Sequence, residues 1–214
     1  MTPAAAKAAV DAVRAHFAAR MRAGREAPAI AEELARVLRL LDEVDFSRAD
    51  EKHLRPSGHP VVTQLGQVMR AAESGPDDAL SPILAAFLPI LDALPWRFSY
   101  APRPDMPDIG ERMAWAELVG PIAPFHSRKV CLGLTAIGPH LLYPAHRHPA
   151  VETYLVVSGT AAWTAAGVTT RRPPGDILVH PSNVVHAMET GDAPLLAAYA
   201  WTGDVETLSE YVDA

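Results

Sequence analysis

Three histidines and one glutamate stand at spacings that suit a metal ion. His146, His148 and Glu152 lie in the pattern His-x-His-x3-Glu-x6-Gly. Because side chains alternate between the two faces of a strand, this even spacing predicts that the two imidazoles and the carboxylate share one face. A second pattern, Gly-x5-Pro-x-Asn-x2-His, ends in His186. Together these ligands suit one divalent transition metal (Fe, Zn, Mn, Co or Ni) and leave a six-coordinate ion open positions for substrate or water.

Tyr154 continues the even spacing after Glu152 and is predicted to face the same site. A nearby metal favours the phenolate, which makes Tyr154 a candidate general base. An unshifted tyrosine, with a pKa of about 10, is ionised to roughly one part in a thousand at pH 7, a cost of about 4 kcal/mol that the metal must largely supply. The alternative is a core tyrosine whose hydroxyl bonds to a ligand, and the residues alone leave the two roles open.

The second half of the chain must position these residues, and its pattern is typical of β-strands. All four Trp, all five Tyr and six of the nine His follow Pro95. The spacing of the apolar runs favours an all-β barrel or sandwich. Strands are predicted at 130–137, 152–157, 160–165, 177–180 and 195–201. Cys131 lies within the first of them and is predicted to be a small buried hydrophobe.

The first 95 residues predict helices instead. Apolar residues recur at helical spacing in two segments, and Gly24 ends the first helix while Pro28 begins the second. Further helices are predicted over 61–73 and 79–91. A helix-turn-helix module is the alternative, but residues 1–95 carry 11 Lys and Arg against 13 Asp and Glu, and no candidate recognition helix has a basic face.

The composition limits the classes of partner. With 214 residues, 49% of them hydrophobic and 21% charged, the chain falls in the globular range. Its net charge of -6 argues against a nucleic-acid partner. Four charged residues interrupt the first 20 positions, so neither a signal peptide nor a membrane span is predicted, and the cytoplasm is the expected location. The single cysteine excludes an internal disulfide.

The two metal-ligand patterns resemble the two conserved motifs of the cupin superfamily, including the glycines and the proline that frame them. The longer stretch 142–160, with His186 and the segment Tyr199-Ala-Trp201, is similar to the cupin-type dimethylsulfoniopropionate lyases of the DddQ branch. The resemblance implies metal ligands at His148, Glu152 and His186 with His146 beside them, a catalytic base at Tyr154 with Tyr143 as the next candidate, and substrate contacts at Tyr143, Trp201 and His146.

The expected fold class is therefore α+β. A cupin β-barrel, or double-stranded β-helix, is expected over residues 96–214, preceded by an N-terminal α-helical region over residues 1–95 that packs on it. Because Glu152 points inward, Val151, Leu155 and Val157 are left on the outer face of the same strand. Such an apolar row must be covered, and the helices are the expected cover.

The resemblance also implies a reaction, the β-elimination of dimethylsulfoniopropionate to dimethyl sulfide and acrylate. A divalent metal on the substrate carboxylate would stabilise the enolate-like transition state. A sulfonium offers no hydrogen-bond donor, so aromatic faces are expected to recognise it by cation–π attraction, about 0.5–2 kcal/mol each. Trp201 and Tyr143 are the candidates, whereas Trp115 and Trp163 are expected to pack structurally.

Two other classes of function remain open. Another metallocupin enzyme, an iron dioxygenase or a sugar isomerase, would use the same four ligands, and oxygen uptake would reveal the dioxygenase. A non-catalytic cupin that binds a small molecule would retain its ligand unchanged. The expected partner is a small-molecule substrate, with neither nucleic acid nor membrane, and a homodimer is left open.

Overall fold

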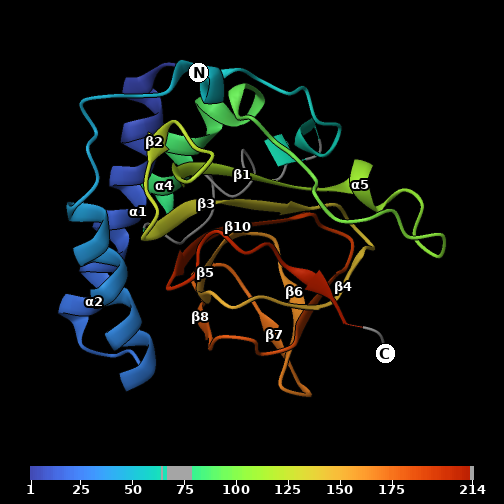
Figure 1. Ribbon diagram of the computed structural model, residues 1–214. Coiled ribbons are helices and arrows are strands. Elements are labelled where there is room, and N and C mark those ends of the chain that lie inside the picture. The colour runs from blue at the N-terminus through green and yellow to red at the C-terminus, as the bar shows by residue number, and fades with distance from the viewer. Residues whose placement is uncertain (64, 67–78, 213–214) are drawn as a thin grey trace.

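The computed structural model describes residues 1–63, 65–66 and 79–212, in which helices precede two β-sheets (Figure 1). The helical elements are α1 Pro3–Ala23, α2 Pro28–Asp42, η1 Glu51–Leu54, α4 Ser81–Phe87, η2 Leu88–Ala93 and α5 Ile109–Arg112. The predicted end of the first helix and start of the second are confirmed, since Gly24 caps α1 in the left-handed region with φ of 63° and Pro28 opens α2. The helix predicted over 61–73 lies mostly outside the described residues.

The helix predicted over 79–91 changes type part of the way along. It is α-helical as α4 and continues as the 3-10 helix η2 from Leu88. Pro89 explains the change, because it has no N–H to donate to the carbonyl one α-helical turn earlier.

The strands form two sheets. They are β1 Met113–Gly120, β2 Phe125–His126, β3 Val130–Ile137, β4 Leu142–Arg147, β5 Val151–Ser158, β6 Ala161–Ala165, β7 Val168–Arg172, β8 Ile177–His180, β9 His186–Thr190, β10 Leu195–Thr202 and β11 Glu210–Tyr211. One sheet has the order β2-β1-β3-β10-β5-β8, and the other has the order β11-β4-β9-β6-β7. The α+β class is confirmed, but the barrel consists of two facing sheets in the described chain and is not closed by continuous strand pairing.

The five predicted strands are all present, with bounds that agree to within one residue. Other strands were not predicted, and β1 and β4 matter most because they line the site described below. Side chains from both sheets fill the space between them, and Tyr143, Tyr154, Trp163 and Tyr199 belong to this buried cluster.

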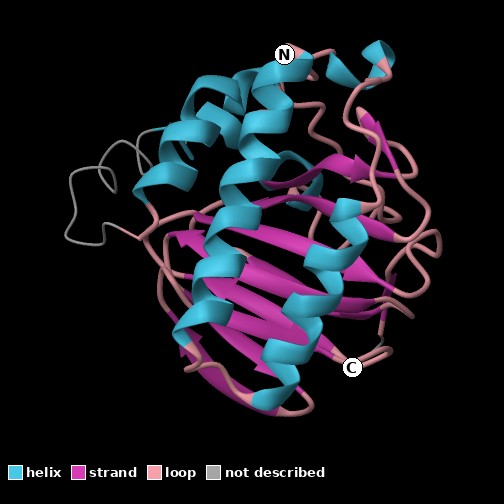
Figure 2. Cartoon of the chain, turned by 90° about the vertical axis from the view of Figure 1, so that its left-hand side faces the viewer, coloured by secondary structure: helices cyan, strands magenta, loops and turns pink. Residues whose placement is uncertain are grey.

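Helices α1 and α2 lie across the outer face of the six-stranded sheet (Figure 2). Leu34 and Val37 of α2 share a second buried cluster with Leu155 and Val157 of β5. The predicted apolar row on the outer face of β5 is thus covered by the helices, as expected. A hydrogen bond also joins α2 to the sheet. The Thr202 hydroxyl of β10 donates it to a carboxylate oxygen of Glu33, a buried residue of α2.

Strand register sets two rows of side chains on the inner face of this sheet. The first row runs across β1, β3, β10 and β5 through Glu117, Gly133, Tyr199 and Tyr154. The second runs across β3, β10, β5 and β8 through Cys131, Trp201, Glu152 and His180. Cys131 is fully buried, as predicted. These two adjacent rows place the residues of the site described next.

A search of the described helices finds none with both the length and the apolar character needed to cross a membrane.

Candidate metal and active site

The four predicted ligands come from three strands and one connection. His146 lies near the end of β4, His148 in the connection that follows, Glu152 on β5 and His186 at the start of β9. The expectation of one continuous strand through the first three was wrong. Because β4 and β5 belong to different sheets, the chain crosses between the sheets at residues 148–150. The four side chains are nonetheless all buried, with exposed fractions of 1–3%.

Three of the four residues form a compact group. One ligand atom each from His148, Glu152 and His186 lies within 4.8 Å of the others, the separation expected of side chains that can hold one ion. His148 Nε2 lies 2.9 Å and His186 Nε2 3.3 Å from Glu152 Oε2. His146 is not part of this group, although its ring centre lies 4.0 Å from that of His186. It therefore sits beside the group, as the resemblance implies.

Backbone carbonyls orient all three imidazoles. A carbonyl can only accept a hydrogen bond, so each histidine must donate from Nδ1, and its Nε2 carries the free lone pair in the neutral ring. Such partners fix the tautomer of metal-binding histidines. The distances to the carbonyl oxygens are 2.8 Å from His146 to Pro144, 3.1 Å from His148 to Ala150 and 2.9 Å from His186 to Val184.

The charges of the group also suit a cation. Burial raises the pKa of Glu152, but the charge of His148, the hydrogen bond from His148 and the nearby imidazole of His186 outweigh it, so the pKa lies well below its usual range. Burial lowers the pKa of His146 well below its usual value, which keeps this ring neutral. Burial lowers the pKa of His148, but the charge of Glu152 and the hydrogen bond to it outweigh burial and raise this pKa. A metal ion would displace the proton from Nε2. One carboxylate and three imidazoles then form a donor set that first-row divalent metals accept.

Trp201 contacts the ligand group directly. Its indole N–H donates a 2.7 Å hydrogen bond to Glu152 Oε1, the oxygen that does not face the histidines. Its ring also stacks on His148, with ring centres 4.3 Å apart and planes inclined by 27°. This contact with the carboxylate was not anticipated from the sequence, in which Trp201 was predicted only to enclose substrate.

The two candidate bases have different surroundings. Tyr154 lies on the face of Glu152, as predicted; burial, then the charge of Glu152, raises the pKa of its phenol well above the usual value. Tyr143 stacks on His146 at 3.9 Å, and its hydroxyl is hydrogen-bonded to that of Tyr100. Tyr100 was missed by sequence analysis, since it lies in a segment with no periodic pattern.

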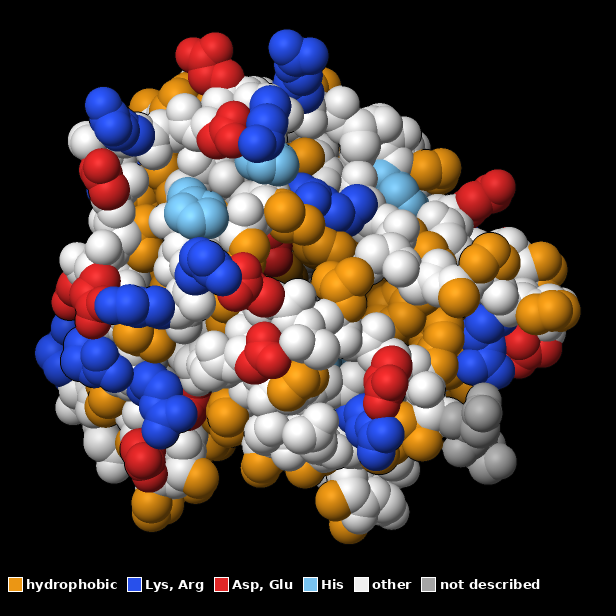
Figure 3. Space-filling model, viewed as in Figure 1, with side chains coloured by type: hydrophobic (Ala, Val, Ile, Leu, Met, Phe, Trp, Pro, Cys, Tyr) orange, Lys and Arg blue, Asp and Glu red, His pale blue; other side chains and the backbone are white. Residues whose placement is uncertain are grey.

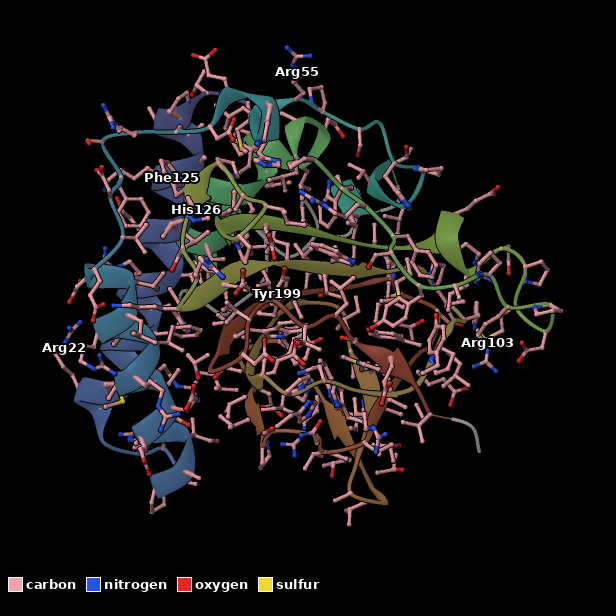
Figure 4. All side chains as sticks on the ribbon, viewed as in Figure 1. Arg22, Arg55, Arg103, Phe125, His126 and Tyr199 are labelled. Atoms are coloured by element: carbon pink, nitrogen blue, oxygen red, sulfur yellow. The ribbon has the colours of Figure 1, made fainter. Side chains whose placement is uncertain are left out.

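A cavity of about 340 Å³ opens beside the ligand group. Its wall on the sheet side consists of residues from β1, β3, β5 and β10, and its rim consists of residues from the connections that precede β1 and follow β1 and β10. Figure 4 shows Tyr199 in the interior between the sheets, whereas Arg22, Arg55 and Arg103 lie at the periphery. The aromatic residues that line the cavity are Tyr100, Trp115, Tyr143, Tyr154, Tyr199 and Trp201.

Two predictions about tryptophans are resolved by this cavity. Trp163 is buried and packs against Tyr154 with ring centres 4.9 Å apart, so its predicted structural role is confirmed. Trp115 was expected to be structural as well, but it lines the cavity. The expectation failed because β1, which carries Trp115 on the inner face, was not recognised as a strand.

His180 also lies beside the ligand group. It is 2% exposed, both of its ring nitrogens lack hydrogen-bond partners, and its Nδ1 lies 3.9 Å from Glu152 Oε2. Burial lowers the pKa of this imidazole to about 3. Only the strand register, which pairs His180 with Glu152, could have revealed its position.

Comparisons with known proteins agree on one family. The model of a family described as dimethylsulfoniopropionate lyase matches residues 31–197. The chain is 31% identical over 157 residues to the putative dimethylsulfoniopropionate lyase DddL of Cereibacter sphaeroides, a match that covers 72% of this chain and 64% of that protein. It is 36% identical over 139 residues to the dimethylsulfoniopropionate lyase DddQ of Ruegeria pomeroyi, covering 63% of this chain and 69% of that protein.

Two solved structures share the fold over nearly their whole length. The crystal structure of the lyase DddQ from Ruegeria pomeroyi superposes with a TM-score of 0.69 at 30% identity, covering 93% of this chain and 95% of that one. A chain from the crystal structures of the lyases RdDddP and RnDddQII superposes with a TM-score of 0.74 at 25% identity, covering 98% of both chains. The helices and the sheets therefore occur together in related proteins.

Proposed function

Since the chain belongs to the dimethylsulfoniopropionate lyase family, we propose that it cleaves dimethylsulfoniopropionate to dimethyl sulfide and acrylate with the help of one divalent metal. The observation that carries this proposal is the convergence of His148, Glu152 and His186 at the wall of an aromatic cavity. The match to DddL spans less than two thirds of that protein's length, so the activity stands here as a proposal.

The residues present fit the metal. Three imidazoles are oriented with Nε2 as the free donor, and Nε2 of His186 is buried without a hydrogen-bond partner. A buried polar atom without a partner is costly, and a ligand for it removes the cost. His148, Glu152 and His186 would hold the ion, with His146 beside it.

The reaction is a β-elimination, and this chain must supply the base. When bound, the metal would withdraw charge from the substrate carboxylate and so acidify the proton on the adjacent carbon. We propose that the Tyr154 phenolate takes this proton. The C–H bonding pair becomes the double bond of acrylate, and the C–S bonding pair leaves with dimethyl sulfide. The position of Tyr154 supports this role, because its side chain lines the cavity two residues from Glu152.

Headspace gas analysis tests the activity. Dimethylsulfoniopropionate is added to the full chain loaded separately with iron, zinc, manganese, cobalt or nickel. We expect dimethyl sulfide and acrylate in equal amounts with at least one metal and neither product after chelation. Absence of dimethyl sulfide with every metal would reject the lyase. Oxygen uptake in the same samples would instead indicate a dioxygenase.

Elemental analysis of four variants tests the ligand set. Alanine at His148, Glu152 or His186 should abolish tight metal binding, because each removes one of few oriented donors. His146→Ala should be the mildest of the four, since water can fill the place of a side chain that lies beside the group. Full metal content in any of the first three variants would remove that residue from the ligand set.

A further inference from the structure

We propose that Glu117 attracts the cationic end of the substrate and makes the cavity selective for zwitterions over carboxylates of the same shape that lack the positive charge. The inference rests on the proposed function, which supplies a substrate with a carboxylate at one end and a sulfonium at the other. The ligand group accounts for the carboxylate. The positive charge needs a separate partner within the cavity.

The first observation is the charge of the cavity. Its charged lining residues are Glu117, Glu152 and Glu206, and none of the described residues that line it is Lys or Arg. A metal ion would compensate Glu152, and Glu206 forms a 2.8 Å ion pair with Arg128. Glu117 takes part in no ion pair within the described parts of the chain. Glu117 is therefore the carboxyl group of the cavity that has no ion-pair partner among the described residues.

The second observation is the burial of this carboxyl group. Glu117 is 6% exposed, and its Oε2 has no hydrogen-bond partner. Burial raises the pKa of Glu117 to about 7, against smaller opposing effects from Arg97, the Cys131 thiol and the Ile122 N–H. Because a buried carboxylate without a counter-ion is costly, a cation that enters the cavity would stabilise its charged form.

The third observation is the geometry around Gly133. In the inner row, Gly133 separates Glu117 from Tyr199. A Cβ at this position would lie 2.8 Å from the Tyr199 ring, so only glycine lets the ring approach the sheet here. Glu117 lines the cavity together with Tyr199 and with Trp115, which lies two residues from Glu117 on the same face of β1.

An anion beside aromatic rings is the arrangement that suits an onium ion. A sulfonium or quaternary ammonium group has no N–H or O–H to donate, so it is recognised by charge and by the negative faces of rings. Glu117 and Tyr154 lie at opposite ends of one row of four residues. Only two methylene groups separate the charged groups of such a substrate, so it does not span the row. With its carboxylate at the ligand group, its cationic group would point along the row and be attracted by Glu117 across the rest of the cavity.

The test compares two carboxylates of the same shape, neither of which releases a sulfide. Titration calorimetry on the metal-loaded full chain measures Kd for 3-(trimethylammonio)propionate and for 4,4-dimethylpentanoate, in which a neutral tert-butyl group replaces the trimethylammonium group. We expect the wild type to bind the trimethylammonium compound at least about 10-fold more tightly. Glu117→Gln should bring this ratio close to one and leave the Kd of the tert-butyl compound within about threefold.

Two further variants separate the buried charge of Glu117 from its shape and from the charge of the rim. Glu206→Gln removes a charge at the exposed rim and should change the ratio by less than about threefold, because Arg128 already pairs with it. Glu117→Asp keeps the charge and should retain most of the preference, and thermal melts establish that each variant is folded. Equal ratios in the wild type and Glu117→Gln would overturn the proposal, as would an equal loss in Glu206→Gln. Because dimethyl sulfide release is measured separately, failure of the lyase assignment is distinguishable from failure of this one.

Discussion

At the scale of single residues, the Glu152 carboxylate is contacted from two sides. The two imidazoles lie against Oε2, and the Trp201 indole N–H binds Oε1. Hydrogen-bond partners of this kind orient a ligand before the metal arrives, and their loss typically costs 10–100-fold in metal affinity. Trp201 is thus placed to act on the carboxylate in addition to lining the cavity.

Trp201→Phe should weaken metal binding by about 10-fold or more, because it retains a ring to stack on His148 but loses the N–H that fixes Glu152. Competition with a chromophoric chelator measures the affinity. Trp163→Phe is the matched control, since Trp163 Nε1 is buried without a hydrogen-bond partner. Equal metal affinity in the wild type and Trp201→Phe would contradict this role.

Tyr154→Phe should keep the fold and the metal while kcat falls by about 10²–10⁴-fold, the usual contribution of a general base. Exchange of the α-proton with deuterated solvent should vanish at the same time. Tyr211→Phe is a suitable control, because Tyr211 lies outside the cavity lining and its hydroxyl has no partner. If Tyr154→Phe turns over at the wild-type rate, Tyr143 becomes the base to test.

At the scale of elements, the sequence predicted the helices and strands in which apolar residues recur at a regular spacing. It missed the features that depend on the pairing of strands. Apolar residues at helical spacing indicated α1 and α2, and Gly24 and Pro28 marked the end of α1 and the start of α2. The pattern around His146 to Glu152 looked like one strand because its spacing stayed even across the connection between the sheets. Alternation cannot distinguish a continuous strand from two strands whose side chains meet at the same point.

The candidate site was predictable to the same extent. The candidate metal ligands carry their own spacing signal, so the sequence could predict that His148, Glu152 and His186 lie together. Glu117, Trp115 and His180 could not, because each owes its place to the register of a strand against a distant neighbour. Tyr100 reaches the site from a connection without regular structure, and no local pattern marks such a residue.

The packing of α2 on the sheet should be measurable through Leu34, which is fully buried. Leu34→Ala should lower the free energy of unfolding by about 2–5 kcal/mol, the cost of removing a buried leucine side chain and leaving a cavity. Chemical denaturation monitored by tryptophan fluorescence measures it. Leu142→Ala is the control, since Leu142 is 45% exposed and should change the stability far less. Equal losses of stability in the two variants would show that the packing of α2 on the sheet contributes little to the free energy of unfolding.

On the scale of the whole molecule, the helices and sheets share one core. The cluster that joins them extends from α1 and α2 to β1, β3, β5 and β10. Figure 3 shows basic and acidic side chains mixed on the face that it presents, with hydrophobic side chains gathered toward its centre and right. We propose a boundary near Pro95 between a helical region and the cupin region. The boundary divides the sequence, but the two regions share one core and are not expected to fold independently.

Deletion of residues 1–95 should give aggregated or poorly folded protein, because it exposes the apolar outer face of the six-stranded sheet. Size-exclusion chromatography and circular dichroism of the fragment 96–214 measure the outcome. A fragment that is monodisperse, metal-loaded and active would contradict this expectation. The full chain prepared in parallel is the reference.

The division of the cavity between a wall of strands and a rim of connections has a consequence for how its specificity can evolve. Glu152, His186 and most of the aromatic wall lie on paired strands, where a change in backbone position would disturb many neighbours at once. The rim residues Ile122, Val205 and Leu208 lie on connections, which tolerate insertion and replacement. Substrates of different bulk can therefore be reached by variation at the rim, while the groups on the sheet that are proposed to carry out the elimination stay unchanged.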